Sequence, residues 1–457
     1  MHKIDMPAGA KEIIEELNKH GYEAYIVGGC VRDCLIGRSP NDWDITTNAK
    51  PDEVKAIFRR TVDTGLEHGT VTIMIGNDGY EVTTYRVDGE YEDHRRPNSV
   101  EFTANLKEDL RRRDFTVNAM AYNDEEGVID IFGGIDDLEK GVIKCVGNAD
   151  DRFDEDALRI LRAVRFAAQL SVDDGNGNRR PFVIEEKTRE AIIHHAPELA
   201  YVSAERIQVE LTKLITSDYP EKLTDAYELG ITKIILPEFD LMMQTEQNNK
   251  HHNCNVGMHT IAVMQNVPAD KVLRYSALLH DSGKPEVKTT DENGVDHFCG
   301  HQEKSEIIAQ QVLRRLKLDN ETIKLVKKLI RYHDFGIWGD VSYKSLRRFL
   351  AQLGSEYFDQ FIKIRFADIM GQSDYQREEK LERIKWIKEA YDVIIAQNHC
   401  LRREDLQING RDLIELGVKP GREMGELLDW ILSEVLENPE LNDKEKLTCM
   451  IKKKINN

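Results

Sequence analysis

Apolar positions recur with two different periods along this chain, which predicts a mixed N-terminal region followed by a longer helical region. A short apolar run predicts a strand at 24–27, and two further runs rich in β-branched and aromatic residues predict a hairpin formed by 70–75 and 80–87 around a glycine-rich turn. Apolar residues three or four positions apart predict helices within 1–21 and at 51–58, 106–122, 152–166, 378–397 and 424–436. The fold class is therefore α+β, with a small mixed sheet in the N-terminal part and helices after it.

Paired glycines, arginines and aspartates follow the first strand at close spacing. Gly28 and Gly29 permit a sharp turn, and Arg32 and Arg38 follow on and after a short predicted helix. Asp42 and Asp44 are predicted to lie in a strand, where residues two apart point to the same face. Two neighbouring carboxylates favour a divalent cation such as Mg²⁺. An isolated Asp-x-Asp is usually a turn, but all these groups occur within 17 residues.

The run GGCVRDCLIGRSPNDWDIT resembles the signature of the class II tRNA nucleotidyltransferase and bacterial poly(A) polymerase family, which includes the CCA-adding enzymes. The resemblance implies a polymerase-beta-like nucleotidyltransferase head and two-metal phosphoryl transfer. It implies Mg²⁺ ligands at Asp42 and Asp44, and nucleotide-binding roles for Gly28, Gly29, Arg32 and Arg38.

Further segments match the same family. YEVTTYR implies that Glu81 is the third catalytic acid, although an exposed strand glutamate is an equally good reading of that residue alone. The charged loop 88–100, with Arg95 and Arg96, matches a loop that helps these enzymes change from C to A addition. LRRRDFTVNAMA implies nucleotide-binding roles for Arg113, Asp114 and Asn118, while a solvated basic face remains an alternative for the three arginines. Ile131 departs from the proline that is usual in the family.

The helical segment at 152–166 carries the residues that would select the nucleotide. Asp156 and Arg159 are three apart and would share a helix face, where a simple salt bridge is the plainest interpretation. EDALRILRAVRF, however, resembles the family's nucleotide-selecting motif, in which an Asp and an Arg hydrogen-bond the incoming base. Arg162 and Arg165 are added to that nucleotide-binding set. The segment 203–211 resembles a bracing motif of the family.

Histidines dominate the chemistry after residue 250. LLHDSGKP, GHQEKS, IRYHD and RFADIMGQ resemble the HD phosphohydrolase superfamily, although a single buried histidine is more often part of a core. The resemblance implies a divalent transition metal held by His259, His280, Asp281 and Asp368. His301 and His333 would hold a second metal or bind substrate phosphate.

Composition limits the setting of the protein. The chain has 457 residues and a net charge of −19, so RNA would have to bind to local basic patches on an acidic body. Seven scattered cysteines without CxxC pairs predict neither a disulfide framework nor a zinc knuckle. The absence of a long apolar run predicts a cytoplasmic protein without a membrane span.

Together these features predict four parts: a head at 1–147, a neck and body at 148–250, an HD domain at 251–372 and a helical tail at 373–457. The tail resembles the family's support for the acceptor–TψC arm of tRNA, with a packed helical cap as the alternative. The predicted activity is addition of C, C and A from CTP and ATP to the 3′ end of tRNA. The alternatives are an A-adding enzyme or poly(A) polymerase, a metal phosphohydrolase with an RNA-binding head, and a nucleotidyltransferase with a small-molecule or protein substrate.

Overall fold

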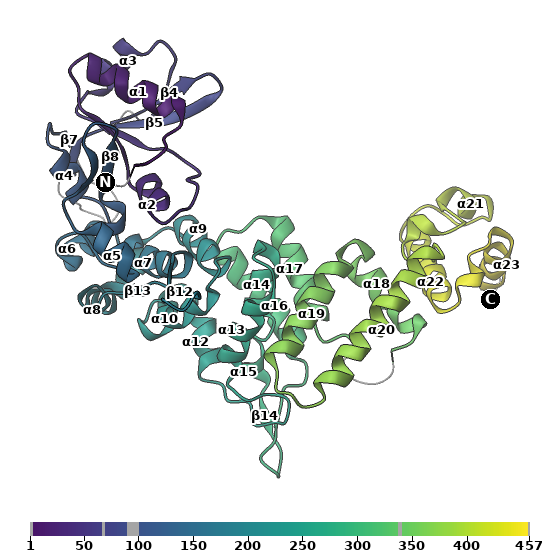
Figure 1. Ribbon diagram of the computed structural model, residues 1–457. Helices are drawn as coiled ribbons and strands as arrows, with labels where there is room; N and C mark the ends of the chain where they lie inside the picture. The colour runs from purple at the N-terminus through teal and green to yellow at the C-terminus, as the bar shows by residue number, and fades with distance from the viewer. Residues whose placement is uncertain (1–2, 66–68, 89–99, 337–340, 456–457) are drawn as a thin grey trace. The chain divides into compact units, whose positions relative to one another are not determined.

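The computed structural model describes residues 3–65, 69–88, 100–336 and 341–455 (Figure 1). Contacts between residues divide the chain into an N-terminal unit, Met1–Asp240, and a C-terminal unit, Leu241–Asn457. Arg95 and Arg96 lie outside the described residues. The four-part division expected from the sequence stays a prediction.

The N-terminal unit is built on a mixed seven-stranded sheet. In spatial order its strands are β3 (Thr61–Gly65), β4 (Thr70–Ile75), β5 (Asp78–Thr84), β2 (Ile45–Thr47), β1 (Ala24–Val27), β8 (Met120–Asn123) and β9 (Gly127–Asp130). Only the β2–β5 pair is parallel, and in its register Ile45 lies opposite Val82. The predicted strand at 24–27 and the hairpin are confirmed, but β2 begins at Ile45, so Asp42 and Asp44 precede the strand instead of lying in it.

Helices cover the sheet. The first of them, α1 (Ala8–Lys19), buries Ile13, Ile14 and Leu17 on one face, and it packs with α3 (Pro51–Ile57) against the sheet (Figure 1). The remaining elements of this region are α2 (Gly29–Leu35), α4 (Leu106–Arg111), a 3₁₀ turn at Thr116–Asn118, α5 (Gly134–Lys140), and the paired short strands β6 (Arg86–Asp88) and β7 (Val100–Phe102).

The helix expected at 106–122 is wrong beyond its first part. The chain leaves α4 after Arg111, makes the 3₁₀ turn and enters β8. Asp114 accepts a hydrogen bond from the backbone N–H of Phe115 at 2.8 Å, a local bond that competes with helix formation. Phe115, Val117 and Met120 are all buried. A run of buried apolar residues is compatible with either a helix or a strand, so the sequence pattern could not distinguish the two.

The expected helix at 152–166 is also divided. It is two helices, α6 (Ala149–Glu155) and α7 (Leu158–Gln169), separated by Asp156 and Ala157. Asp156 has an extended backbone (φ −151°, ψ 101°), and its Oδ1 accepts a hydrogen bond from Leu158 N at 3.1 Å. This local side chain–backbone bond, together with the extended backbone of Asp156, explains the break.

The rest of the N-terminal unit is helical apart from two small strand pairs. The helices are α8 (Glu186–His195), a 3₁₀ helix at Ala196–Tyr201, α9 (Ala204–Ile215), α10 (Leu223–Glu228), α11 (Thr232–Ile235) and α12 (Pro237–Met243), the last of which crosses the boundary between the units. The strand pairs are β10 (Val142–Ile143) with β13 (Val183–Ile184), and β11 (Ser171–Asp173) with β12 (Arg179–Pro181).

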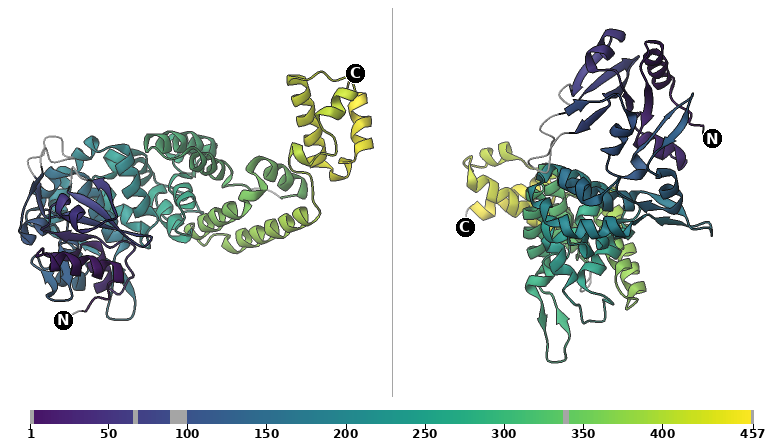
Figure 2. Two further views of the ribbon diagram at one scale, coloured as in Figure 1. Left: turned by 90° about the horizontal axis from the view of Figure 1, so that it is seen from above. Right: turned by 90° about the vertical axis from the view of Figure 1, so that its left-hand side faces the viewer.

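The C-terminal unit begins with a helical bundle. Its helices are α13 (Val256–Asn266), α14 (Lys271–Leu279), α15 (Lys284–Val287), α16 (His301–Arg315), α17 (Asn320–Tyr332), α18 (Tyr343–Leu353), α19 (Phe358–Gly371) and α20 (Arg377–Ala396). Helix α13 packs along α19, and α16 packs along α17. A hairpin of β14 (Thr289–Thr290) and β15 (Asp296–His297) projects from the bundle in Figure 1 and in the right-hand view of Figure 2.

The last helices have a hydrophobic core of their own. They are α21 (Gly410–Glu415), α22 (Arg422–Glu437) and α23 (Lys444–Ile455). The cluster runs from Cys400 to Ile451 and includes Leu413, Ile431 and Leu447, each fully buried. Among the described residues, no helix is long and apolar enough to cross a membrane. All seven cysteines are free thiols.

Candidate catalytic and metal-binding sites

Gly28 makes the turn between β1 and α2. Its φ of +79° is in the left-handed region that favours glycine, and an added Cβ would lie 2.8 Å from Nη1 of Arg113. The backbone conformation therefore favours glycine here, whereas the Arg113 guanidinium could move aside for a side chain. The predicted nucleotide-binding residues Gly28 and Arg113 therefore lie close together.

The three predicted catalytic acids lie at one end of the parallel strand pair. Extending the β2–β5 register by one residue places Asp44 beside Glu81, and Asp44 O accepts a hydrogen bond from Val27 N at 2.9 Å. Partial burial raises the pKa of Asp44; Glu81 and Asp42 raise it further, and Arg113 acts against them. Asp42, Asp44 and Glu81 therefore lie close enough together for their charges to act on Asp44.

Four predicted nucleotide-binding residues form one hydrogen-bonded chain. Arg32 donates to Asn118 Oδ1 at 2.5 Å, and Asn118 donates to Asp114 Oδ1 at 3.0 Å. Arg162 donates twice to Asp114 Oδ2, at 2.9 and 2.6 Å. Although burial alone would raise the pKa of Asp114, Arg162 and Asn118 outweigh it and hold the pKa below its usual range. These residues fix one another in position.

The arginine run at 111–113 is mostly engaged within the protein. Arg112 donates to the buried carboxylate of Asp109 at 2.8 Å, and Arg113 lies 3.5 Å from the same residue. Of the other predicted arginines, Arg38 donates to the carbonyl of Gln169 at 2.8 Å. Arg165 is buried, donates to Glu210 at 2.7 Å and stacks on Phe166, so it contributes an internal ion pair.

Asp156 and Arg159 are near each other, but their side chains are held by different partners. Asp156 Oδ2 accepts from Arg206 at 2.7 Å. Arg159 donates to Glu155 Oε2 at 2.5 Å and to the carbonyl of Arg112 at 2.9 Å. Sequence reasoning did not assign roles to Arg206 and Glu155, although both belong to segments that it had matched to family motifs.

In the C-terminal unit, all six predicted metal ligands come together. They form, with Asp334, the histidine–aspartate cluster: His259, His280, Asp281, His301, His333, Asp334 and Asp368. The residues lie on five helices or at their ends. Their spacing in the sequence therefore could not show that they meet in space. Asp334 was missed as a ligand, although the His333–Asp334 pair repeats the His280–Asp281 pair and could have indicated it.

The four imidazoles of the cluster direct Nε2 inward. Nε2 of His280 lies 3.3 Å from Nε2 of His259, and Nε2 of His301 lies 3.3 Å from that of His333. Each Nδ1 lies against a backbone carbonyl, at 3.1 Å for His259, 2.7 Å for His280, 2.8 Å for His301 and 2.6 Å for His333. Donation from Nδ1 leaves the Nε2 lone pairs facing one another, an arrangement that cations would stabilise.

Carboxylates link the two halves of the cluster. Asp281 Oδ2 lies 3.2 Å from His280 Nε2, and its Oδ1 lies 3.3 Å from His301 Nε2. Asp368 Oδ1 lies 3.1 Å from His259 Nε2. Burial would raise the pKa of Asp281, but His280 and Lys284 outweigh it and hold the pKa well below its usual range. The donor set of imidazoles and a bridging carboxylate fits two transition-metal ions.

The cluster opens onto a cavity of about 730 Å³. Three lysines line it, Lys250, Lys284 and Lys380, together with the aromatic side chains of Phe298 and Tyr375. Lys284 lies 2.7 Å from Asp281, and Lys250 stacks on Tyr375. The cavity is therefore suited to an anionic ligand that reaches the cluster.

Comparisons with known proteins agree with this architecture. Three family models match: "Poly A polymerase head domain" over residues 24–144, "Probable RNA and SrmB- binding site of polymerase A" over 181–243, and "tRNA nucleotidyltransferase domain 2" over 290–451. The CCA-adding enzyme of Levilactobacillus brevis is 34% identical over 446 residues, which cover 97% of this chain and 96% of that protein. The chain belongs to the CCA-adding enzyme family.

Other relatives give the same assignment. The CCA-adding enzyme of Lactobacillus delbrueckii is 45% identical over 268 residues, and this match spans 58% of the chain and 65% of that protein. The crystal structure of the Bacillus stearothermophilus CCA-adding enzyme in complex with CTP is 29% identical, with a TM-score of 0.72 and coverage of 99% of this chain and 98% of that one. The predicted family, enzyme class and α+β fold are confirmed, whereas the HD resemblance and the roles of individual site residues stay predictions.

Proposed function

We propose that this chain adds C, C and A from CTP and ATP to the 3′ end of tRNA, with Asp42, Asp44 and Glu81 as the catalytic acids. The observation that carries the proposal is the parallel register of β2 and β5, which puts Asp44 beside Glu81 in a chain that aligns over 97% of its length with a CCA-adding enzyme. The CTP bound in the B. stearothermophilus relative supports a nucleotide triphosphate as substrate.

The acids of the head fit Mg²⁺. Carboxylate oxygens are the donors that this ion prefers, and Glu81 and Asp42 are close enough to Asp44 to raise its pKa, so the three acids could act on one ion. Mg²⁺ held by Asp42 and Asp44 would supply Lewis-acid stabilisation of the charge on the reacting phosphoryl group. Glu81 faces the same region and would orient or accept the proton of the primer's 3′-hydroxyl.

The surrounding cations would position the nucleotide. Arg32, held by Asn118, is ordered before any ligand arrives and would contact the triphosphate beside Gly28 and Gly29. Asp156 and Arg159 would read the base, because a carboxylate accepts and a guanidinium donates. Arg206 and Glu155 would act as positioning residues for this pair.

A primer-extension assay tests the proposal. Transcripts of tRNA that end at the discriminator base, in C, or in CC are incubated with Mg²⁺ and CTP, ATP or both. All three should stop at CCA, and the Asp42→Ala/Asp44→Ala variant should be inactive. Asp136→Ala is the matched control, because this exposed carboxylate on α5 pairs only loosely with Lys140, at 3.7 Å.

The same assay decides among the alternatives. Extension of the CC transcript alone would indicate an A-adding enzyme, and unlimited addition of A would indicate a poly(A) polymerase. No extension of any transcript would contradict the assignment of the head.

The histidine–aspartate cluster supports a second activity, metal-dependent phosphohydrolysis in the C-terminal unit. The inward-facing Nε2 atoms would hold a divalent transition metal, and Lys250 and Lys380 would attract a phosphate ester into the cavity. Hydrolysis of p-nitrophenyl phosphate with Mn²⁺, Co²⁺, Ni²⁺ or Zn²⁺ tests this. His280→Ala should abolish the hydrolysis, and His399→Ala, outside the cluster, should retain it. Equal rates in both variants would contradict the activity.

A further inference from the structure

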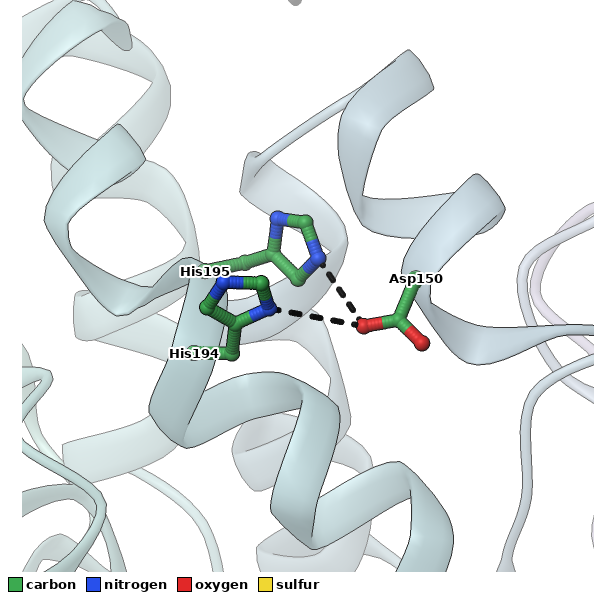
Figure 3. Close-up of side chains that lie close together, drawn as sticks. All are labelled: Asp150, His194 and His195. Atoms are coloured by element: carbon green, nitrogen blue, oxygen red, sulfur yellow. Dashed lines mark hydrogen bonds and ion pairs between the residues drawn. The ribbon is translucent and has the colours of Figure 1, made fainter.

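A separate group of imidazoles and carboxylates lies in the N-terminal unit, outside the sites described above. His194 and His195 form the last two residues of α8, and Asp150 is in the first turn of α6. Both imidazoles direct a nitrogen toward the same carboxylate oxygen of Asp150 (Figure 3). Asp150 Oδ1 lies 3.7 Å from His194 Nδ1 and 3.1 Å from His195 Nε2.

The spacing of these three atoms suits a small metal ion. All three lie within 4.8 Å of one another. Ligand atoms bonded to a tetrahedral Zn²⁺ are separated from one another by roughly 3.3–3.6 Å, as follows from bond lengths of about 2.0–2.2 Å. The two distances to Asp150 lie on either side of this range, so small rotations of the exposed His194 and Asp150 side chains would complete the geometry.

His195 is the best-fixed member of the group. Its side chain is only 6% exposed, and it has acceptors on both sides. Nδ1 lies 2.9 Å from Glu198 Oε1 and 3.4 Å from Asp154 Oδ1, while Nε2 faces Asp150. A neutral imidazole has a single N–H, so one nitrogen must face a carboxylate with its lone pair unless a proton or a cation lies between them.

Glu198 supplies the orientation that a metal-binding histidine needs. Metal-bound histidines almost always donate their second ring nitrogen to a carboxylate or a carbonyl, which fixes the tautomer and the ring direction. Donation from His195 Nδ1 to Glu198 leaves the Nε2 lone pair directed at Asp150 and His194. The hydrogen bond between His195 and Glu198 does not depend on the distances among the three donor atoms, and it also indicates a metal ion at this position.

We propose that Asp150, His194 and His195 bind one divalent transition-metal ion such as Zn²⁺. Imidazole nitrogen favours ions of this class over Mg²⁺. The ion would tie the beginning of α6 to the end of α8, two helices that already pack together.

The position of α6 gives the site a consequence for catalysis. The helix ends at Glu155, which holds Arg159, and is followed directly by Asp156. A metal at its other end would therefore restrain the helix that carries these base-selecting residues. This consequence rests on the proposed function, whereas the binding of the ion does not.

Equilibrium dialysis of the full chain against Zn²⁺, after treatment with a chelator, tests the proposal. His194→Ala and Asp150→Asn alter exposed groups, and each should bind one Zn²⁺ fewer than the unmodified protein or bind it at least about tenfold more weakly. Glu198→Gln should weaken the same ion about tenfold. Ions bound at the histidine–aspartate cluster are common to all these proteins and cancel in the difference.

His20→Ala provides the matched control. His20 Nδ1 lies 3.7 Å from Glu16 Oε1, the same separation as between His194 and Asp150, but it is exposed and pairs with a single carboxylate. This variant should bind as many Zn²⁺ ions as the unmodified protein. Unmodified zinc binding in either His194→Ala or Asp150→Asn would overturn the proposal. Because the readout is bound metal, the result stands whether or not the head extends tRNA.

Discussion

The head and the histidine–aspartate cluster both gather carboxylates, but they balance the negative charge in different ways. In the head, partial burial raises the pKa of Asp44, Glu81 and Asp42 raise it further, and the guanidinium of Arg113 acts against them. In the cluster, the carboxylates lie among four imidazoles, and Lys284 and Arg365 pair with Asp281 and Asp368. There the pKa of Asp281 is held well below its usual range.

We propose that this difference distinguishes a site for Mg²⁺ that exchanges from a site for a metal that stays bound. An exposed group of carboxylates is suited to Mg²⁺ that arrives and leaves with each nucleotide. A buried group with preoriented nitrogen donors is suited to a metal that stays bound, since the cost of burying its charges is largely met by fixed partners. Substitutions and metal removal at the two sites test this contrast.

The largest effect is expected for Asp44→Asn. Removing one of the carboxylates proposed to hold Mg²⁺ should lower the rate of nucleotide addition by about a hundredfold to a thousandfold, a loss typical of removing a group that stabilises transition-state charge. Single-turnover extension of tRNA measures this rate. Transition-metal binding by the C-terminal unit should be unchanged, and a parallel loss there would show that the two sites are not separate.

Removal of metal should affect the two sites unequally. We consider a metal that binds the cluster and whose free concentration is about a hundredfold above its Kd. Removing this metal with a chelator should lower the free energy of unfolding of the C-terminal unit by about 2.7 kcal/mol. Removing Mg²⁺ alone should have little effect on the head. Calorimetry with EDTA, compared with simple omission of Mg²⁺, measures both. Equal shifts in the two conditions would contradict a resident metal.

A smaller effect is expected for Arg206→Ala. This change leaves Asp156 without the guanidinium that holds Oδ2 at 2.7 Å, so the carboxylate should lose its fixed orientation. We expect discrimination between correct and incorrect nucleotides to fall about tenfold, the order of a lost charge-assisted hydrogen bond. Competition between CTP and UTP on the discriminator transcript measures it. Arg179→Ala is a control, because Arg179 contacts Ser171 in a separate strand pair.

The smallest effect is a dependence of stability on pH. A raised pKa means that folded Asp44 holds its proton more tightly than the unfolded chain does, so its contribution to stability falls as the pH rises from about 3.8 through the folded pKa. Without Mg²⁺, Asp44→Asn should therefore raise the Tm at pH 7 and leave it nearly unchanged at pH 3. The gain should stay below about 1 kcal/mol, because solvent screens this exposed group. A Tm difference that is equal at both pH values would contradict the interpretation.

The sequence was sufficient to predict a helix or strand where the spacing of apolar residues directly reflects the local backbone geometry. The strand at 24–27, the hairpin and the long helices at 377–396 and 422–437 were predicted nearly at their observed bounds. It failed where a side chain bonds to the neighbouring backbone, as at Asp114 and Asp156, because such bonds interrupt a helix without disturbing the apolar period.

The sites show the same limit. Motifs identified the acids, glycines and histidines, but not the partners that hold them, since Arg206, Glu155 and Lys284 are defined by contacts in space. Asp334 was within reach of sequence reasoning, because it repeats the His-Asp pairing at 280–281. The group of Asp150, His194 and His195 could not be found in this way, because Asp150 and His194 are 44 positions apart in the sequence.

The anchoring of the imidazoles bears on how the cluster could persist through evolution. Nδ1 of His280, His301 and His333 each lies against the carbonyl three residues earlier in its own chain segment. The local backbone therefore sets the direction of these three rings. Substitutions in other segments should leave that direction unchanged. His259 alone depends on a distant carbonyl, that of Gly371. Decay of the site in a lineage would therefore be expected to begin at the junction of α13 and α19.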